Sequence, residues 1–238
     1  MSVKTLEIDG QTVTGLDGDP IFRVAWEHGI HIPRLCHVGG VSDVGACRVC
    51  LVEVEGQKKL AAACLTPVEE GMVVHTDTPR LKEQRKLIVE LLLAERNHVC
   101  SVCVFNGSCE LQSLAVTLGI DHVRLRYQFP HFTADTSHER FGLDHHRCIL
   151  CTRCVRVCDE IEGAHTWDVA GRGTHSHIIC DIDEPWGTSD TCTGCGKCVQ
   201  ICPTGALFEK GKGIAEMRKD RSFLKYITTA REKKQWIG

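Results

Sequence analysis

Sixteen cysteines, most of them in short runs, constrain this chain of 238 residues more than any other feature. The strongest run is DTCTGCGKCVQICPTG, in which Cys192, Cys195, Cys198 and Cys202 are followed by proline. This spacing, C-x2-C-x2-C-x3-C-P, is that of bacterial ferredoxins, whose thiolates hold [4Fe–4S] clusters. Three thiolates two residues apart can wrap one face of a cubane, while the fourth points towards a second cluster.

A second run supplies that neighbouring cluster. It reads HHRCILCTRCVRVCD and has Asp159 where proline is usual. In two-cluster ferredoxins the fourth cysteine of each run ligates the other cluster. The rule predicts two ligand sets: Cys148, Cys151, Cys154 with Cys202, and Cys192, Cys195, Cys198 with Cys158. The alternative is zinc, which prefers two separated C-x2-C pairs around one ion and fits two triplets poorly.

Two further blocks lie nearer the N-terminus. Cys36, Cys47, Cys50 and Cys64 form a C-x2-C pair with two flanking single cysteines. This is the plan of a [2Fe–2S] ferredoxin, although the first gap is longer than in plant-type proteins. A structural zinc site is an open alternative for this block alone. The other block, NHVCSVCVFNGSC, supplies only three thiolates and needs a fourth ligand.

The remaining metal-binding residue types have simpler interpretations. Cys180, in HSHIICDID, is predicted to be a small buried apolar residue on a strand, with no further role. Four histidines are expected on exposed loops or strand faces: His145, His146, His175 and His177.

Patterns between the cysteines predict the local structure. Residues 3–15 alternate around Asp9-Gly10 and predict a β-hairpin. A short helix follows, with Asp19 as cap, Pro20 in the first turn and Gly29 at the end. CLVEVEG and GMVVHT predict strands that complete a small α+β unit near residue 78.

Two longer helices are expected in the middle of the chain. Thr78-Pro79 opens the first, with Leu81, Ile88, Leu91 and Leu92 on or near one face. The second carries Leu111, Leu114, Ala115 and Leu118 at helical spacing, and Gly119 stops it. Residues 120–140 predict a linker. A basic C-terminal segment has Phe223, Ile227 and Ala230 at helical spacing, and either a solvated helix or a docking segment fits it.

Composition narrows the function further. The net charge of −3 argues against a nucleic-acid binder. The N-terminus has no apolar signal core, and the run LIVELLLA is interrupted by Glu90 and too short to span a membrane. A cytoplasmic location is expected, where cysteines serve as metal ligands rather than in disulfides. Neither a Rossmann glycine fingerprint nor a P-loop is present.

The order of these blocks resembles a known iron–sulfur module. It is similar to the N-terminal part of the large iron–sulfur subunit of respiratory complex I and to the N-terminal arm of iron-only hydrogenases. The resemblance covers roughly residues 3 to 210. Because the chain stops after the ferredoxin-like part, it most resembles the small diaphorase subunit of NAD-reducing soluble nickel–iron hydrogenases.

The resemblance implies an α+β chain with one [2Fe–2S] and three [4Fe–4S] clusters. The implied parts are a β-grasp [2Fe–2S] ferredoxin-like domain (1–78), a helical His/Cys3 segment (79–138), a bacterial-type two-cluster ferredoxin-like domain (139–210) and a basic tail (211–238). The chain would relay electrons between a flavin subunit that binds NAD(H) and the small and large subunits of a nickel–iron hydrogenase. It would have no active site of its own within a hydrogen:NAD+ oxidoreductase complex.

Other functions fit the same motifs. The relay could serve an NAD-dependent formate dehydrogenase, an NADP-reducing iron-only hydrogenase or a complex I variant. A zinc-stapled scaffold or interaction protein is a third kind of function, which metal content alone distinguishes.

The resemblance also supplies the missing ligand of the three-cysteine block. In that family the block reads H-x3-C-x2-C-x5-C, and histidine completes the cluster. Here the position four before Cys100 is Arg96, whose guanidinium stays protonated and cannot bind iron. His98 lies two residues nearer, so the expected ligands are His98, Cys100, Cys103 and Cys109. The alternative is a solvated histidine, with water or a distant side chain on the fourth iron.

Overall fold

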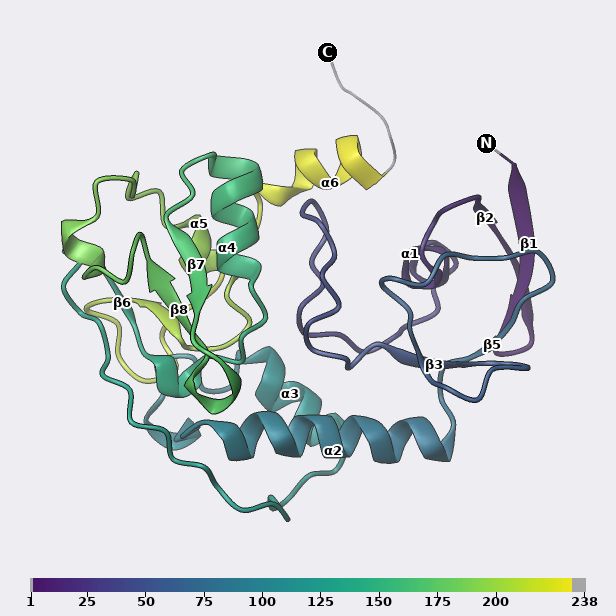
Figure 1. The fold of residues 1–238 in the computed structure, drawn as a ribbon, viewed down its shortest axis with the longest axis horizontal. Coiled ribbons are helices and arrows are strands. Elements are labelled where there is room, and N and C mark those ends of the chain that lie inside the picture. The colour runs from purple at the N-terminus through teal and green to yellow at the C-terminus, as the bar shows by residue number, and fades with distance from the viewer. Residues whose placement is uncertain (1, 233–238) are drawn as a thin grey trace. The chain divides into compact units, whose positions relative to one another are not determined.

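The computed structural model describes residues 2–232, which form two compact units (Figure 1). Unit 1 contains the residues up to His37 together with Asp43–Val89. Unit 2 contains Val38–Ser42 and the residues from Glu90 onward. Each unit has its own hydrophobic core. The longest helix, α2 (Pro79–Glu95), begins in unit 1 and ends in unit 2.

Unit 1 is built on a mixed sheet with the strand order β2-β1-β5-β3-β4. The strands are β1 (Val3–Ile8), β2 (Gln11–Leu16), β3 (Leu51–Val54), β4 (Ala61–Ala62) and β5 (Val73–His75). Strand β1 pairs antiparallel with β2 and parallel with β5. Asp9 and Gly10 both have positive φ, as a two-residue type I′ turn requires. The predicted hairpin is confirmed.

Helix α1 (Ile21–Glu27) follows the hairpin but begins differently from the prediction. Pro20 precedes the helix, and no side chain caps its N-terminus. The Asp19 carboxylate instead accepts the backbone N–H of Leu16 at 3.0 Å, which ties the helix entry to the end of β2. The expected cap is therefore wrong. Gly29, with φ of +75°, follows the helix end as predicted.

Helix α2 begins at Pro79 as predicted, and the Thr78 hydroxyl caps it by accepting the backbone N–H of Leu81 at 3.2 Å. Its buried side chains in unit 1 include Leu81, Arg85 and Val89. Arg85 donates to two backbone carbonyls of unit 1, which satisfies its buried guanidinium. Leu91, predicted on or near the apolar face, is 51% exposed. That part of the prediction is wrong: the buried face of the helix passes through Leu81, Arg85 and Val89, and Leu91 lies off it.

Unit 2 consists of short elements between cysteine-bearing loops. Its helices are α3 (Glu110–Thr117), α4 (Arg153–Val157), α5 (Lys197–Ile201) and α6 (Leu224–Glu232). Its strands are β6 (Phe141–Leu143), β7 (Trp167–Ala170), β8 (His177–Cys180) and β9 (Leu207–Glu209). Single helical turns are η1 (Cys100–Val102), η2 (His145–Arg147), η3 (Cys158–Glu162), η4 (Gly173–His175) and η5 (Trp186–Thr188). Strand β6 pairs with β9, and β7 with β8, both antiparallel.

The two C-terminal cysteine runs adopt the same local structure. In each run the third cysteine, Cys154 or Cys198, lies in a short helix, α4 or α5. A residue with left-handed backbone precedes each helix, Thr152 before α4 and Gly196 before α5. The two helices pack against each other, as Figure 1 shows. Related sequence spacing thus produces related backbone.

The remaining predicted segments are also observed. Helix α3 buries Leu111, and Gly119, with φ of +65°, follows its end. The structure describes all of 118–140 and has no helix or strand there. In the described part of the tail, helix α6 buries Ala230, and Arg231 donates to the carbonyl of Gly40. The helix thus packs on its own unit, and residues 233–238 of the predicted tail lie outside the described residues. Among the described residues, no helix combines the length and the apolar character needed to cross a membrane.

Candidate iron–sulfur sites

Four cysteines come together inside unit 1. Cys36, Cys47, Cys50 and Cys64 are all buried. The backbone N–H of Cys36 donates to the sulfur of Cys47 at 3.3 Å, and the sulfurs of Cys50 and Cys64 lie 3.4 Å apart. The hydrogen bond with the Cys36 side chain lowers the pKa of Cys47 to about 7 against the opposing effect of burial. A thiol that ionises this easily is a ready metal ligand.

Three pockets in unit 2 contain the other predicted ligands. We name them the His98, Cys148 and Cys192 pockets. Their lining includes, in that order, His98, Cys100, Cys103 and Cys109; Cys148, Cys151, Cys154 and Cys202; and Cys158, Cys192, Cys195 and Cys198. Each set of four predicted ligands therefore lines one pocket.

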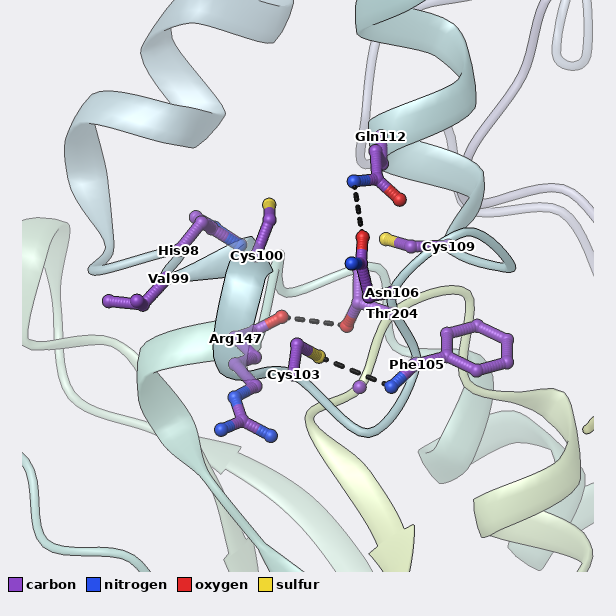
Figure 2. Close-up of a pocket in the computed structure, with 11 residues that line it drawn as sticks. His98, Val99, Cys100, Cys103, Phe105, Asn106, Cys109, Gln112, Arg147 and Thr204 are labelled. Carbon is purple, nitrogen blue, oxygen red and sulfur yellow. Dashed lines mark hydrogen bonds between the residues drawn. The ribbon is translucent and has the colours of Figure 1, made fainter. Parts of the chain in front are cut away.

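The His98 pocket lies between the end of α2 and the start of α3, and Figure 2 shows its lining side chains. Turn η1 carries Cys100, and Cys109 immediately precedes α3. The imidazole Nε2 of His98 is buried and has no hydrogen-bond partner among the described residues. Burial lowers the pKa of His98 to about 4, against a hydrogen bond with the Leu92 backbone. His98 is therefore neutral at pH 7, with a ring nitrogen free to bind metal.

One short segment separates the His98 pocket from the Cys148 pocket. Thr204 lines both, and its hydroxyl donates to the Arg147 carbonyl at 2.7 Å. At Gly205 a Cβ atom would lie 2.6 Å from the sulfur of Cys103. The absence of a side chain at Gly205 therefore lets this wall approach the ligands of the His98 pocket.

The Cys148 and Cys192 pockets exchange their fourth cysteines. Cys202, from the last run, lines the Cys148 pocket, while Cys158, from the run before it, lines the Cys192 pocket. Burial raises the pKa of Cys148 to about 12 and of Cys151 to about 11. Metal binding at such buried thiols must therefore displace their protons.

A charged network joins α3 to α4 and to the segment before α6. Both oxygens of the Glu110 carboxylate accept from the Arg153 guanidinium at 2.8 Å, and one also accepts from Arg221 at 2.6 Å. Burial acts to raise the pKa of Glu110, but the hydrogen bonds and charges of these arginines outweigh it and hold that pKa below its usual value. Glu110 is therefore ionised at neutral pH.

Several of these neighbours are absent from the sequence-based prediction. The indole of Trp186 donates to the sulfur of Cys192, and Lys219 lies among the residues that line the pockets. The sequence contains one signal that could have identified Trp186 as a neighbour of the ligands. Aromatic residues are scarce in this chain, and this tryptophan lies just before a cysteine run. Neither spacing nor composition identifies Lys219, since its contacts are with residues far away in the sequence.

Three of the four predicted surface histidines are placed differently from the expectation. His145, His146 and His177 are half-buried, and His146 is within hydrogen-bond distance of the Phe132 carbonyl, at 3.0 Å. Burial lowers the pKa of His145 to about 4. Their expected exposure is wrong because the 120–140 segment packs over them. Cys180 is buried on β8, as predicted.

Comparison with known families gives three consecutive matches. Residues 3–79 match the 2Fe-2S iron-sulfur cluster binding domain, and residues 85–124 match the NADH-ubiquinone oxidoreductase-G iron-sulfur binding region. Residues 140–208 match the ferredoxin-like domain of NADH-quinone oxidoreductase subunit 3. These matches confirm the predicted [2Fe–2S] and ferredoxin-like iron–sulfur domains.

Individual relatives differ in how much of their length the chain spans. It is 36% identical to the NADP-reducing hydrogenase subunit HndD of Solidesulfovibrio fructosivorans over 88% of this chain, but spans 36% of that protein. It is 38% identical to the NADPH-Fe(3+) oxidoreductase subunit alpha of Geobacter sulfurreducens over 87% of this chain and 24% of that protein.

Two relatives match nearly end to end. A chain in a crystal structure of NAD+-reducing [NiFe]-hydrogenase superposes with a TM-score of 0.83 at 31% identity, with 89% of each chain covered. The gamma subunit of the NAD-reducing hydrogenase HoxS of Cupriavidus necator is 36% identical over 90% of this chain and 89% of its own length. The chain thus belongs to the family of iron–sulfur subunits that includes this gamma subunit and the corresponding region of the NADH-ubiquinone oxidoreductase-G proteins.

Proposed function

We propose that this chain is the electron-transfer subunit of an NAD-reducing nickel–iron hydrogenase and carries one [2Fe–2S] and three [4Fe–4S] clusters. When bound, such clusters accept and release single electrons. The chain's own residues hold the clusters, shield them from water and set their potentials. It has no catalytic site of its own in this proposal, and the hydride and hydrogen chemistry takes place in other subunits.

The observation that carries the proposal is the lining of the three pockets in unit 2. Each contains a complete set of four ligands predicted for one [4Fe–4S] cluster, two sets from the two-cluster spacing rule and the His98 set from the family resemblance. The sets combine residues from distant parts of the sequence, such as Cys148 with Cys202 and Cys158 with Cys192. The unpartnered Nε2 of His98 supports its assignment as the fourth ligand beside Cys100, Cys103 and Cys109.

The arrangement of the ligands favours clusters over zinc. Four ligands of a structural zinc ion converge on one point, with bonds of about 2.0–2.3 Å. The ligands here instead line pockets in two triplets that exchange their fourth cysteines, as in two-cluster ferredoxins. Among the described residues, no group of three or more His, Cys, Asp or Glu side chains is arranged to hold a single metal ion.

For the [2Fe–2S] cluster we assign Cys36, Cys47, Cys50 and Cys64. Their burial and close contacts in unit 1 support this assignment, as does the matched family of residues 3–79. We further propose that unit 1 has the β-grasp fold. A hairpin followed by a helix, with β1 paired parallel to β5, supports this.

We propose the domain boundaries that the motifs imply. The parts are a [2Fe–2S] domain (1–78), a His/Cys3 segment (79–138), a two-cluster ferredoxin-like domain (139–210) and a C-terminal segment (211–238). The three family matches support this order. In the proposed cytoplasmic complex, the [2Fe–2S] domain receives a flavin subunit that binds NAD(H), and the two-cluster domain is nearer the hydrogenase small and large subunits. The name and coverage of the Cupriavidus necator relative support membership of an NAD-reducing hydrogenase complex.

A second candidate is the same relay role in an NADP-reducing hydrogenase. The observation in its favour is 36% identity with the HndD subunit of Solidesulfovibrio fructosivorans over 88% of this chain. Both candidates use the same cluster sites, so they differ only in the partner chains and in the nicotinamide cofactor.

Metal and sulfide analysis tests the cluster proposal. Protein prepared without oxygen should contain about 14 iron and about 14 labile sulfide per chain, because each cluster contributes its full core composition. Visible charge-transfer absorption should accompany them. Stoichiometric zinc without labile sulfide would contradict the proposal.

Isolation of the native complex separates the two candidates. Nickel together with H2-dependent NAD reduction supports the first. An iron-only hydrogenase subunit with a preference for NADP supports the second. Molybdenum or tungsten with formate-dependent activity would contradict both.

A further inference from the structure

Lys219 lies in the segment that follows β9, beyond the matched ferredoxin-like region of residues 140–208. Its ammonium group points into unit 2 and not into solvent. Nζ donates to the carbonyl of Val199 at 2.6 Å and to that of Leu207 at 3.4 Å. It also lies 4.6 Å from the centre of the Phe105 ring, a cation–π distance.

Two of the three contacts of this ammonium group line a pocket. Phe105 lines the His98 pocket and Leu207 lines the Cys148 pocket. The third contact, Val199, lines none of the three pockets but directly follows Cys198, a proposed ligand in the Cys192 pocket. One positive charge therefore lies against the walls of two pockets and next in sequence to a ligand of the third.

The electrostatic environment agrees with this position. Burial lowers the pKa of Lys219, while the thiols of Cys202, Cys198 and Cys109 act in the opposite direction. These cysteines belong to the Cys148, Cys192 and His98 pockets respectively. Each pocket therefore contributes one cysteine that interacts with the same ammonium group.

Lys219 also lacks an ordinary counter-ion. No carboxylate forms an ion pair with it among the residues whose side chains the structure describes. The nearby Glu110 carboxylate is engaged by Arg153 and Arg221. A buried cation without a counter-ion is costly, and several kilocalories per mole are typical for such an ion. A cluster with thiolate ligands is anionic and offsets this cost.

We propose that Lys219 is a positioning charge shared by the three [4Fe–4S] sites, and that it raises their reduction potentials. The inference rests on the proposed clusters. Reduction adds one electron to a cluster and makes it more negative, and Lys219 keeps its proton in both states. A fixed positive charge stabilises the reduced form more than the oxidised form, because net charge and local electrostatics set cluster potentials.

The test compares Lys219→Gln with the unaltered full-length chain, both loaded with iron and sulfide. Clusters are titrated with dithionite at controlled potentials and followed by electron paramagnetic resonance. In the variant, the ratio of oxidised to reduced cluster at a given potential should rise about tenfold. A tenfold change corresponds to about 59 mV for one electron. All three [4Fe–4S] signals should move in this direction.

Two matched variants separate charge from structure. Lys219→Arg keeps the charge. Its ratio of oxidised to reduced cluster at a given potential should lie within about threefold of the ratio in the unaltered chain. Lys225→Gln removes an exposed lysine from α6 and should change nothing. If Lys219→Gln loses its iron, the Lys219→Arg variant becomes the test. Lys219→Arg that retains its iron and has unaltered reduction potentials supports the inference. A tenfold change in its ratio of oxidised to reduced cluster overturns the inference.

Different results would contradict the proposed function and the proposed role of Lys219. An unaltered chain that binds neither iron nor sulfide contradicts the proposed function. Full iron content with unchanged potentials in Lys219→Gln contradicts only the role of Lys219.

Discussion

The indole N–H of Trp186 donates a hydrogen bond to the sulfur of Cys192 over 3.2 Å. Trp186 is 1% exposed and packs against the rings of Phe141 and Trp167. Its backbone N–H donates to the Asp135 carboxylate at 2.7 Å, which fixes the residue from the other side. The donor is therefore held rigidly at a proposed cluster ligand.

Replacement of Trp186 by phenylalanine should lower the reduction potential of the cluster in the Cys192 pocket. A hydrogen bond to a ligand sulfur withdraws negative charge and favours the reduced state, and it is one of the determinants of cluster potential. Redox titration followed by electron paramagnetic resonance measures the change. Trp26→Phe alters a tryptophan that is 54% exposed and serves as the control. An unchanged potential at full iron content would contradict the role of this hydrogen bond.

Variants of His98 test the fourth ligand of its pocket. His98→Cys should retain a [4Fe–4S] cluster at a lower potential, because an anionic thiolate replaces a neutral imidazole. His98→Ala should make the cluster labile and reduce the iron content by about four per chain. Iron analysis and spectroscopy at each stage of purification follow both variants.

His122→Ala is the matched control for these variants, since its side chain is 73% exposed in the same unit. It should leave iron content and potential unchanged. If His98→Ala also leaves content, potential and spectrum unchanged, the fourth ligand is a different group.

Gly205→Ala should destabilise the cluster in the His98 pocket more than the other clusters. The added methyl group would lie 2.6 Å from the sulfur of Cys103, too close for an unstrained contact. Either the ligand or the Thr204 wall must then shift, and overpacking of this kind typically costs about 1–3 kcal/mol. Cluster loss during oxygen exposure, monitored separately for each signal, is the measurement. Equal loss rates for all clusters would indicate that the wall tolerates the methyl group.

Glu110→Gln should lower the free energy of unfolding by about 3 kcal/mol, since it leaves the buried Arg153 without its anionic partner. The pKa of Glu110 is held below its usual value, so its contribution is complete at neutral pH and is lost as the pH falls through that lowered pKa. Thermal unfolding at pH 7, with exposed Glu139→Gln as control, measures the effect. A change equal to that of the control would mean that Arg221 and solvent compensate.

Removal of one proposed cluster should interrupt electron transfer between the two ends of the complex. Cys47→Ala should spare H2-dependent dye reduction and abolish H2-dependent NAD reduction. The physical reason is that electron tunnelling falls off steeply with distance, so a missing centre is not bypassed. Both activities are measured on the purified complex. Intact NAD reduction would place the [2Fe–2S] centre off the main path.

The features that sequence predicted correctly depend on local chemistry. The Asp9-Gly10 turn, the helix start at Thr78-Pro79 and the stop at Gly119 each follow from the backbone preferences of one or two residues. Cysteine spacing also acts locally, because the two related runs form the related short helices α4 and α5.

The features that sequence missed depend on partners far away in the chain. Asp19 accepts a hydrogen bond from the end of β2 instead of capping a helix. Arg85 can be buried because two backbone carbonyls of unit 1 accept hydrogen bonds from its guanidinium. His145 is covered by a segment without regular structure, which no periodicity predicts. Lys219 reaches the pockets from a segment outside every recognisable motif.

The exchange of fourth cysteines has a consequence for biogenesis. Cys148, Cys151 and Cys154 are translated well before Cys202, the fourth cysteine that lines their pocket. A nascent chain that ends before position 202 therefore has only three of the four proposed ligands of this pocket. If the proposed cluster is bound here, its complete ligand set forms only after position 202 has been translated.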